Sequence, residues 1–181
     1  QKIEQVGEGS IRRYLLHYKT PDGLDVLHEA VSREDPEEFA ASLALLGEGK
    51  TPSPRRCLVI PIIDGGKLLL LKRFLFALNS WCVCLPEIEL EEGKAFSSNV
   101  DEGLRAITGH GLRQDIGRNL TLQLQSSFSC PDLLEEGVQM AFASIEEEAS
   151  ASVDPALLAV PFILKRDEVG AFMDANTLPI S

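Results

Sequence analysis

Carboxylates are concentrated in residues 85–112, within and just before a stretch that has the pattern of a helix. Glu87, Glu89, Glu91 and Glu92 precede this stretch, and Glu102 lies within it. Carboxylate oxygens are the ligands that Mg²⁺ and similar hard cations take, and such a cation bridges the phosphates of a substrate. One interpretation is a metal site built from Glu87, Glu91, Glu102 and one distant acid. The other, which we favour, is a carboxylate-rich surface loop on an acidic protein.

The same segment resembles the Nudix box, a loop-and-helix motif of phosphate-hydrolysing enzymes written G-x5-E-x7-R-E-U-x-E-E-x-G-U, where U is a bulky apolar residue. Counted without gaps, the motif opens at Ile88, in place of its first glycine, and closes at His110. Its loop glycine corresponds to Gly93, its helical apolar residue to Leu104 and its last glycine to Gly109. The scaffold of the motif is therefore present.

The residues that carry the chemistry of the motif are missing. Its helical glutamates lie at i, i+3 and i+4, so they share one helix face and hold the metal there. In this chain those positions are Gly103, Ala106 and Ile107, whose side chains cannot ligate a cation. Lys94 replaces the loop glutamate, and Glu102 replaces the arginine. The resemblance therefore implies a Nudix scaffold whose hydrolytic site is impaired or lost, and we expect no metal at the box.

A wider resemblance, to the ADP-ribose pyrophosphatase branch of the Nudix hydrolases, extends over most of residues 11–175. It implies the Nudix fold, a mixed β-sheet sandwiched between helices, preceded by an N-terminal β-hairpin that helps to form a homodimer. It also implies a nucleotide-diphosphate ligand. The segments that carry it are the Pro21-Asp22-Gly23 turn, Ile60-Pro61, Leu71-Lys72-Arg73, Trp81, Leu85-Pro86, Leu158-Ala159-Val160-Pro161 and Asp167-Glu168-Val169.

We favour a catalytically impaired protein that binds such a ligand or a partner protein. From the fold resemblance, Arg73, Phe74 and Trp81 are expected to line the place where these enzymes hold the base or the terminal ribose. For Trp81 a position in the core is the stronger interpretation. A third interpretation is a structural subunit whose hairpin and Phe74-Leu75-Phe76 loop form an interface.

The alternative function is an active, Mg²⁺-dependent hydrolase that cleaves the diphosphate of ADP-ribose-like substrates. Displaced acids must then supply the chemistry, and Glu91, Glu102 and Glu147 are the candidate catalytic residues. Glu147 belongs to an acidic run, Glu146-Glu147-Glu148, in the region from which this branch takes a catalytic base. A solvated acidic loop is the more common role of such a run.

Composition excludes several classes of partner. The formal net charge is −11, whereas a nucleic-acid groove needs clustered Lys and Arg. No signal peptide and no apolar run of the ~20 residues that a membrane-spanning helix requires is evident, so we expect a cytoplasmic protein. The four cysteines lack metal-ligand spacing, and we expect buried free thiols. The chain begins at Gln1 rather than Met, which leaves room for an upstream segment.

The hydrophobic pattern predicts an α+β fold in two parts. Residues 1–50 are expected to form the hairpin, with strands at 11–18 and 24–31, and a short helix at 36–46. Residues 51–181 are expected to form the Nudix-like domain, after a linker at 47–54. Its predicted strands are at 57–63, 67–73, 81–85, 120–128, 138–145 and 157–164, and its predicted helices are at 98–108 and 167–173.

The termini of the box helix also carry local signals. Ser98 with Asp101 three residues later fits a capping box at its start. Gly109 or Gly111 fits a left-handed cap at its end.

Overall fold

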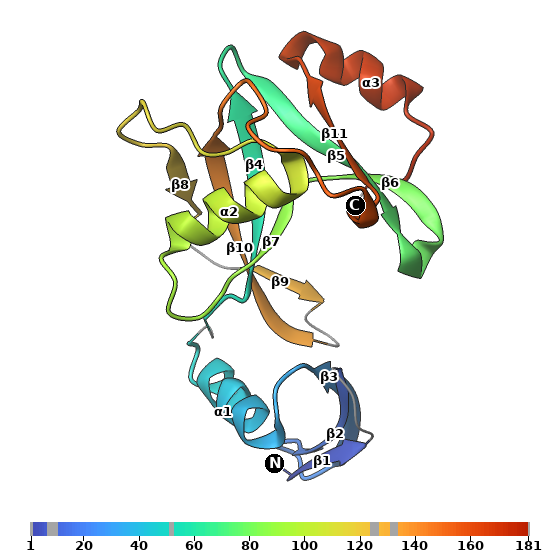
Figure 1. The fold of residues 1–181 in the computed structure, drawn as a ribbon. Helices are drawn as coiled ribbons and strands as arrows, with labels where there is room; N and C mark the ends of the chain where they lie inside the picture. The colour runs from blue at the N-terminus through green and yellow to red at the C-terminus, as the bar shows by residue number, and fades with distance from the viewer. Residues whose placement is uncertain (1, 7–10, 51–52, 124–126, 131–133, 181) are drawn as a thin grey trace. The chain divides into compact units, whose positions relative to one another are not determined.

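The chain forms two compact units, which are drawn as a ribbon in Figure 1. The first comprises Gln1–Pro54 and Ser126–Val138, and the second comprises Arg55–Gln125 and Gln139–Ser181. The structure is a computed structural model, and it describes residues 2–6, 11–50, 53–123, 127–130 and 134–180.

The first unit is built on the predicted antiparallel hairpin, which consists of β2 (Arg12–Lys19) and β3 (Asp25–Ser32). Its turn forms at Pro-Asp-Gly as predicted: the N–H of Gly23 donates to the Thr20 carbonyl at 2.9 Å. Gly23 has a φ of +83°, a conformation that glycine adopts without steric strain. A strand that the sequence pattern did not predict, β1 (Lys2–Val6), pairs antiparallel with β2.

The remaining strands of this unit come from later in the sequence. β3 runs parallel to the start of β10 (Leu134–Ser144), with Val31 opposite Leu134. β9 (Ser127–Cys130) pairs antiparallel with the same part of β10.

The helix α1 (Pro36–Gly47) covers the hairpin. Asp35 caps it, because its carboxylate accepts the N–H groups of Glu37 and Glu38, each at 2.9 Å. Phe39 packs on Tyr14 of β2 with ring centroids 4.5 Å apart, and both side chains are buried. The predicted helix at 36–46 is confirmed, and these two aromatic side chains form the centre of its contact with the hairpin.

The second unit contains a mixed sheet, as predicted. β4 (Arg56–Ile63) and β11 (Ala159–Leu164) flank β5 (Lys67–Leu75), and both are antiparallel to it. β6 (Ser80–Cys84) also pairs with β5, and β7 (Glu87–Glu89) pairs with β4. The end of β10 lies next to β4 and carries β8 (Leu120–Leu122) on its other side.

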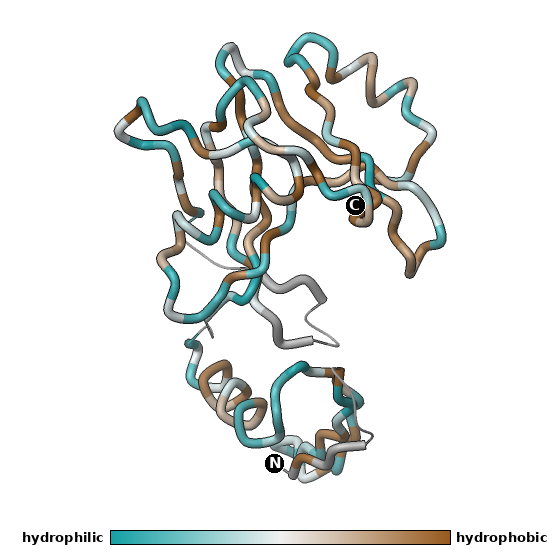
Figure 2. Tube along the Cα trace, in the orientation of Figure 1, coloured by the Kyte–Doolittle hydropathy of each residue, from teal (hydrophilic) through white to brown (hydrophobic). Residues whose placement is uncertain are grey.

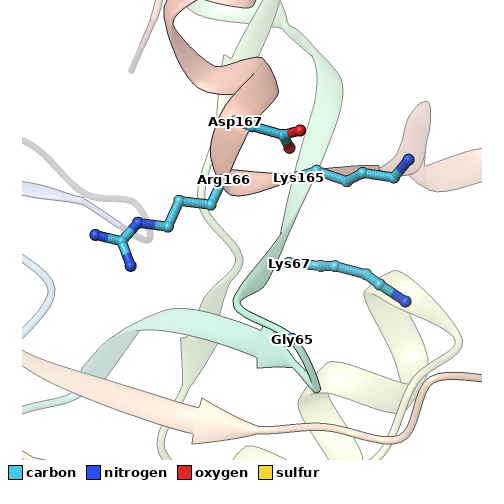
Figure 3. Close-up of a pocket in the computed structure, with 5 residues that line it drawn as sticks. All are labelled: Gly65, Lys67, Lys165, Arg166 and Asp167. Atoms are coloured by element: carbon cyan, nitrogen blue, oxygen red, sulfur yellow. The ribbon is translucent and has the colours of Figure 1, made fainter.

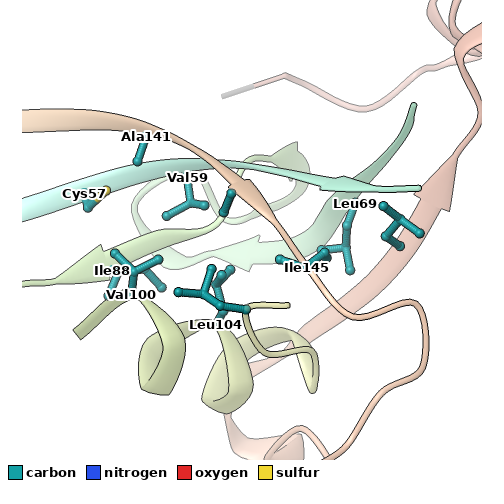
Figure 4. Packing of buried hydrophobic residues seen from close by; sticks show 11 residues of the cluster. Cys57, Val59, Leu69, Ile88, Val100, Leu104, Ala141 and Ile145 are labelled. Carbon is teal, nitrogen blue, oxygen red and sulfur yellow. The ribbon is translucent and has the colours of Figure 1, made fainter. Parts of the chain in front are cut away.

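The box helix, α2 (Phe96–Thr108), covers one face of this sheet. Strand residues alternate between the two faces, and every second residue of β4 from Cys57 to Ile63 is buried. Figure 4 shows the helix side chains Val100 and Leu104 pointing at these strands. The buried cluster comprises Cys57, Val59, Ile63, Leu69, Ile88, Val100, Leu104, Leu112, Ala141, Ala143 and Ile145.

A short helix, α3 (Val169–Ala175), covers the opposite face. Leu70, Val83 and Leu164 form a second buried cluster there, and Phe162 packs on Phe172 of α3 with centroids 5.7 Å apart. The sheet is thus enclosed between α2 and α3, and Figure 2 shows its strands as mostly hydrophobic between polar outer loops. The predicted fold class, an α+β fold with a mixed sheet between helices, is confirmed.

Several predicted boundaries were wrong. The box helix begins at Phe96, two residues before the predicted capping residue Ser98, so the Ser98 capping box does not form. The predicted strand at 120–128 corresponds to β8 and to part of β9, and residues 124–126 between them lie outside the described residues. Residues 155–157 form a 3-10 turn, and the last strand starts only at Ala159. None of the helices in the described ranges is both long and apolar enough to cross a membrane.

Candidate functional site

The loop before α2 is held by one buried side chain, Asn99. Its carbonyl oxygen accepts the N–H of Glu91 at 3.0 Å. Its amide nitrogen donates to the carbonyls of Glu91 and Lys94, each at 3.3 Å. Only 5% of Asn99 is exposed, so these bonds replace the water that its polar atoms would otherwise bind. Asn99 therefore fixes the loop that carries Glu91 and Lys94 against the helix that carries Glu102.

Lys94 joins the two predicted acids of this region. Its ammonium Nζ lies 2.7 Å from Oε2 of Glu102 and 3.4 Å from Oε2 of Glu91. Bonding to Glu102, and then the charges of both carboxylates, raise the pKa of Lys94. In the box pattern, position 94 is a glutamate and position 102 an arginine, so the chain carries both charges exchanged. An ion pair between the two positions is compatible with either arrangement.

The three metal-binding positions of the box offer no oxygen ligand. Gly103 has no side chain, Ala106 is exposed, and Ile107 packs against the core cluster. Hard cations require oxygen ligands, so these side chains do not fit the Mg²⁺ that the box resemblance implies. Across the described residues, no group of three or more His, Cys, Asp and Glu side chains is placed to hold a metal ion.

Gly103 also fits its surroundings as a glycine. A Cβ added to it would lie 2.4 Å from Cγ2 of Ile88 on β7, far closer than such atoms approach. Ile88 stands where the box has its opening glycine, and only 4% of it is exposed. The side chain of Ile88 therefore fills the space beside the helix position that carries a glutamate in the box.

The C-terminal end of α2 is joined to the chain after β10 by Arg105. Its Nε bonds to Asp101 at 3.1 Å, and its two terminal nitrogens lie 3.3 and 3.4 Å from the carboxylate of Glu146. Arg105 also donates to the hydroxyl of Ser150. The other oxygen of Asp101 accepts the N–H of Leu112 at 2.6 Å. This network is structural, since it ties two loops to the helix and occupies the charged groups.

The predicted left-handed cap at the end of α2 is confirmed at Gly109, which has a φ of +80°. The Nδ1 atom of the buried His110 lies 3.0 Å from the carbonyl of Glu146. The helix thus ends where the glycine signal predicted.

Glu147, the third predicted catalytic acid, has a different ion-pair partner from Glu91 and Glu102. It forms an ion pair with Lys67, the first residue of β5. The hydrogen bond and charge of Lys67 lower the pKa of Glu147 below its ordinary value. The structure thus brings Glu91 and Glu102 together on Lys94, while Glu147 has a different cation as its partner.

Two of the three predicted ligand-contacting residues lie together. Phe74 and Trp81 are directly opposite each other on β5 and β6, with ring centroids 5.8 Å apart and planes 76° from parallel. Lys72, which sequence analysis did not single out, lies over the Trp81 ring with its Nζ 5.5 Å from the centroid. The sequence could have indicated this contact, because Lys72 lies two residues before Phe74 and residues two apart share a strand face.

Arg73 points to the other face of the sheet. It pairs with Cys82 across the two strands, and its charge opposes the burial that raises the pKa of Cys84. Arg73 is therefore not in the same cluster as Lys72, Phe74 and Trp81. Trp81 itself is half-buried rather than enclosed in the core.

The cysteines whose side chains are described are free thiols, as predicted. Cys57 and Cys82 are fully buried, and Cys84 is half-buried. Burial raises the pKa of Cys57 to about 12, so this thiol stays protonated and unreactive.

Comparison with known proteins finds similarity in structure and none in sequence. No family profile and no curated protein matches the sequence. A solved structure described as an ADP compounds hydrolase matches the fold with a TM-score of 0.69, over 96% of this chain and 80% of that chain. The two sequences are 12% identical, so the match establishes the fold and not the activity. The chain therefore has a Nudix-like fold, with a mixed sheet between helices.

Proposed function

We propose that this protein uses its Nudix-like scaffold for binding rather than for metal-dependent hydrolysis. The observation that carries the proposal is the composition of the box helix, where Gly103, Ala106 and Ile107 offer no metal ligand. Lys94 supports it as well, because its ammonium already pairs with both Glu91 and Glu102.

The proposed ligand is a nucleotide diphosphate, held by Lys72, Phe74 and Trp81. An aromatic side chain stacks on a base, and an ammonium group attracts phosphate. Here an exposed lysine and a half-buried indole lie within contact of each other on one sheet face. The structural neighbour is described as a hydrolase of ADP compounds, which makes ADP and ADP-ribose the first ligands to test.

Intrinsic fluorescence tests this proposal directly, because Trp81 is the only tryptophan in the chain. Titration with ADP-ribose or ADP in the presence of EDTA should quench or shift its emission in a saturable way. Lys72→Ala should weaken this binding by roughly tenfold, the effect of losing one charge-assisted hydrogen bond. Arg73→Ala, which removes a cation from the opposite face, is the matched control and should change affinity less. Saturable binding that is unaffected by Lys72→Ala would contradict the proposed site.

The alternative, a hydrolase with displaced acids, has one observation in its favour. Glu91 and Glu102 lie within reach of the same ammonium group, so a cation that displaced Lys94 would meet two carboxylates. If this alternative holds, the protein should turn over ADP-ribose with Mg²⁺, and EDTA should abolish that turnover. Glu91→Gln, Glu102→Gln or Glu147→Gln should also lose it.

We also propose that the hairpin of the first unit forms a homodimer interface. Leu24 and Leu27 are 66% and 59% exposed, and Val26 is exposed on the other face of β3 from Leu27. Exposed apolar side chains at one end of a hairpin suit a protein contact. Light scattering should give a dimer for the wild type and a monomer for the double variant Leu24→Glu/Leu27→Glu. Leu45→Glu, at an exposed leucine of α1, is the control and should leave the dimer intact. A monomeric wild type would contradict this interface.

A further inference from the structure

A pocket of about 470 Å³ opens in the second unit at the end of the sheet where β5 begins and β11 ends. It is lined by Gly65 of the turn between β4 and β5, by Lys67, and by the consecutive residues Lys165, Arg166 and Asp167. Three cations and one carboxylate thus line a single pocket on a chain whose formal net charge is −11. Figure 3 shows the lining side chains.

The register of the sheet brings the two lysines to the same end of neighbouring strands. Leu68 of β5 pairs with Leu164 of β11 in an antiparallel ladder. Lys67 and Lys165 are the next residues beyond this pair, and both line the pocket. In Figure 3 their ammonium groups extend in the same direction, whereas the guanidinium of Arg166 points away. Like charges on neighbouring strands repel each other.

Each of the two lysines already has a carboxylate partner in the structure. Glu147 pairs with Lys67 from outside the set of lining residues. Lys165 Nζ lies 3.8 Å from Glu168, at the limit of an ion pair, and that glutamate also accepts the backbone N–H of Lys165 at 3.0 Å. Asp167 adds a carboxylate to the pocket lining. A multiply charged anion between the lysines would satisfy both of them at once.

We propose that this pocket binds a phosphate or diphosphate group, with Lys67 and Lys165 as its charged donors. Gly65 suits this role, because it has a φ of +81° and open space where a Cβ would lie, so an anion can approach the backbone closely. Glu147 competes with the anion for Lys67.

The site is separate from the proposed nucleotide site. Lys67 lies five residues before Lys72 on the same strand, a separation of about 16 Å along an extended chain. The two lysines also lie on opposite faces, because an odd number of steps along a strand changes the face. The failure of either proposal therefore leaves the other standing.

Isothermal titration of the full chain with inorganic pyrophosphate tests the pocket. The wild type should bind pyrophosphate, and Lys165→Gln and Lys67→Gln should each weaken binding by about tenfold or more, the effect of losing a charge-assisted contact. Lys50→Gln is the matched control, since Lys50 is an exposed lysine of the first unit that also pairs with a glutamate. Its affinity should equal that of the wild type.

A second variant separates a built site from general attraction to lysines. Glu147→Gln removes the competitor of the anion and should tighten binding several-fold, whereas Glu148→Gln, at the neighbouring residue, should change it less. Parallel titrations with phosphate and ADP distinguish the sources of the anion. If ADP binds more tightly than pyrophosphate and its binding is weakened by Lys165→Gln, the pocket takes a nucleotide phosphate. If pyrophosphate binds as tightly as ADP, the pocket takes the free anion.

The outcomes that overturn the proposal are equally definite. They are no heat of binding at millimolar pyrophosphate, binding that Lys165→Gln and Lys67→Gln leave unchanged, and an equal loss in Lys50→Gln. Circular dichroism of each variant establishes that a lost signal comes from folded protein.

Discussion

Ile88 and Gly103 reverse the side-chain sizes that the box motif has at these two positions. The motif has a glycine at the strand position and a glutamate on the helix, whereas here the strand carries the large side chain and the helix carries none. The two residues are in contact, since a Cβ on Gly103 would lie 2.4 Å from Ile88. Loss of the glutamate is therefore part of the packing of α2 on the sheet, and restoring that one residue would not restore the site.

Gly103→Ala should destabilise the protein although alanine is the better helix former. The gain in helix propensity is roughly 1 kcal/mol, but overpacking a core contact typically costs about 1–3 kcal/mol. Urea unfolding should therefore show a lower free energy of unfolding than that of the wild type. Gly170→Ala on α3 is the control, because its Cβ would meet open space, and it should not destabilise.

The same contact predicts strong coupling between the two positions. An Ile88→Ala background removes the two closest contacts and leaves only Cβ at 3.3 Å, so Gly103→Ala should be much less destabilising there. A double-mutant cycle measures this difference. Additive effects of the two substitutions would show that Ile88 is not the residue that excludes a side chain at position 103.

Asp101→Ala should destabilise by about 1–3 kcal/mol, because it leaves the buried N–H of Leu112 without its acceptor. Asp101→Asn keeps an oxygen for that N–H and loses only the charge opposite Arg105, so its effect should be smaller. Urea denaturation of the two variants gives the ranking. An equal loss in both would attribute the effect to the ion pair rather than to the backbone bond.

The ion pair of Lys67 with Glu147 predicts a pH dependence. The pKa of Glu147 is lowered in the folded protein from its ordinary value of 4.5, chiefly by the hydrogen bond from Lys67. Its contribution to stability is therefore present above pH 4.5 and is lost as the pH falls through the lowered value. Glu147→Gln should be less stable than the wild type at neutral pH and equally stable in strong acid. A difference that persists unchanged at low pH would contradict this linkage.

Burial of Cys57 predicts that alkylating reagents reach it only through unfolding. With its pKa raised to about 12, the thiol is not ionised at pH 8. Peptide-resolved mass spectrometry after iodoacetamide treatment should show Cys57 unmodified in the native protein and modified in urea. Stability attributable to the protonated thiol should be lost between pH 9 and about 12, because the unfolded thiol ionises first. Rapid native labelling of Cys57 would contradict this assignment.

Local sequence patterns correctly predicted the elements that short-range signals are enough to specify. The hairpin follows from Pro-Asp-Gly between alternating strands, and α1 follows from Pro36, the acidic Glu37 and Glu38, and an apolar face. The predicted start of α2 was wrong because contacts with the preceding loop, rather than a capping box, determine where the helix begins. Asn99 holds the preceding loop, and Asp101 serves Leu112 and Arg105 instead of a capping box.

The candidate sites depended more on register than on composition. Arg73 was predicted to lie with Phe74 and Trp81, yet adjacent strand residues face opposite sides, and Lys72 is the cation that lies over Trp81. Lys67 and Lys165 lie almost a hundred positions apart in the sequence. Only the pairing of β5 with β11 brings them together, and no local pattern reports it.

We propose above that the protein binds its ligand on a Nudix-like scaffold without hydrolysing it in a metal-dependent reaction. The most direct test of this proposal is the release of AMP or phosphate from ADP-ribose and other nucleoside-diphosphate sugars, with Mg²⁺ or Mn²⁺ and with EDTA as the control. Folded protein should release neither product above the EDTA background while still binding ADP-ribose at Trp81. Metal-dependent turnover that EDTA abolishes and Glu102→Gln removes would contradict the claim and identify a working hydrolase with displaced acids.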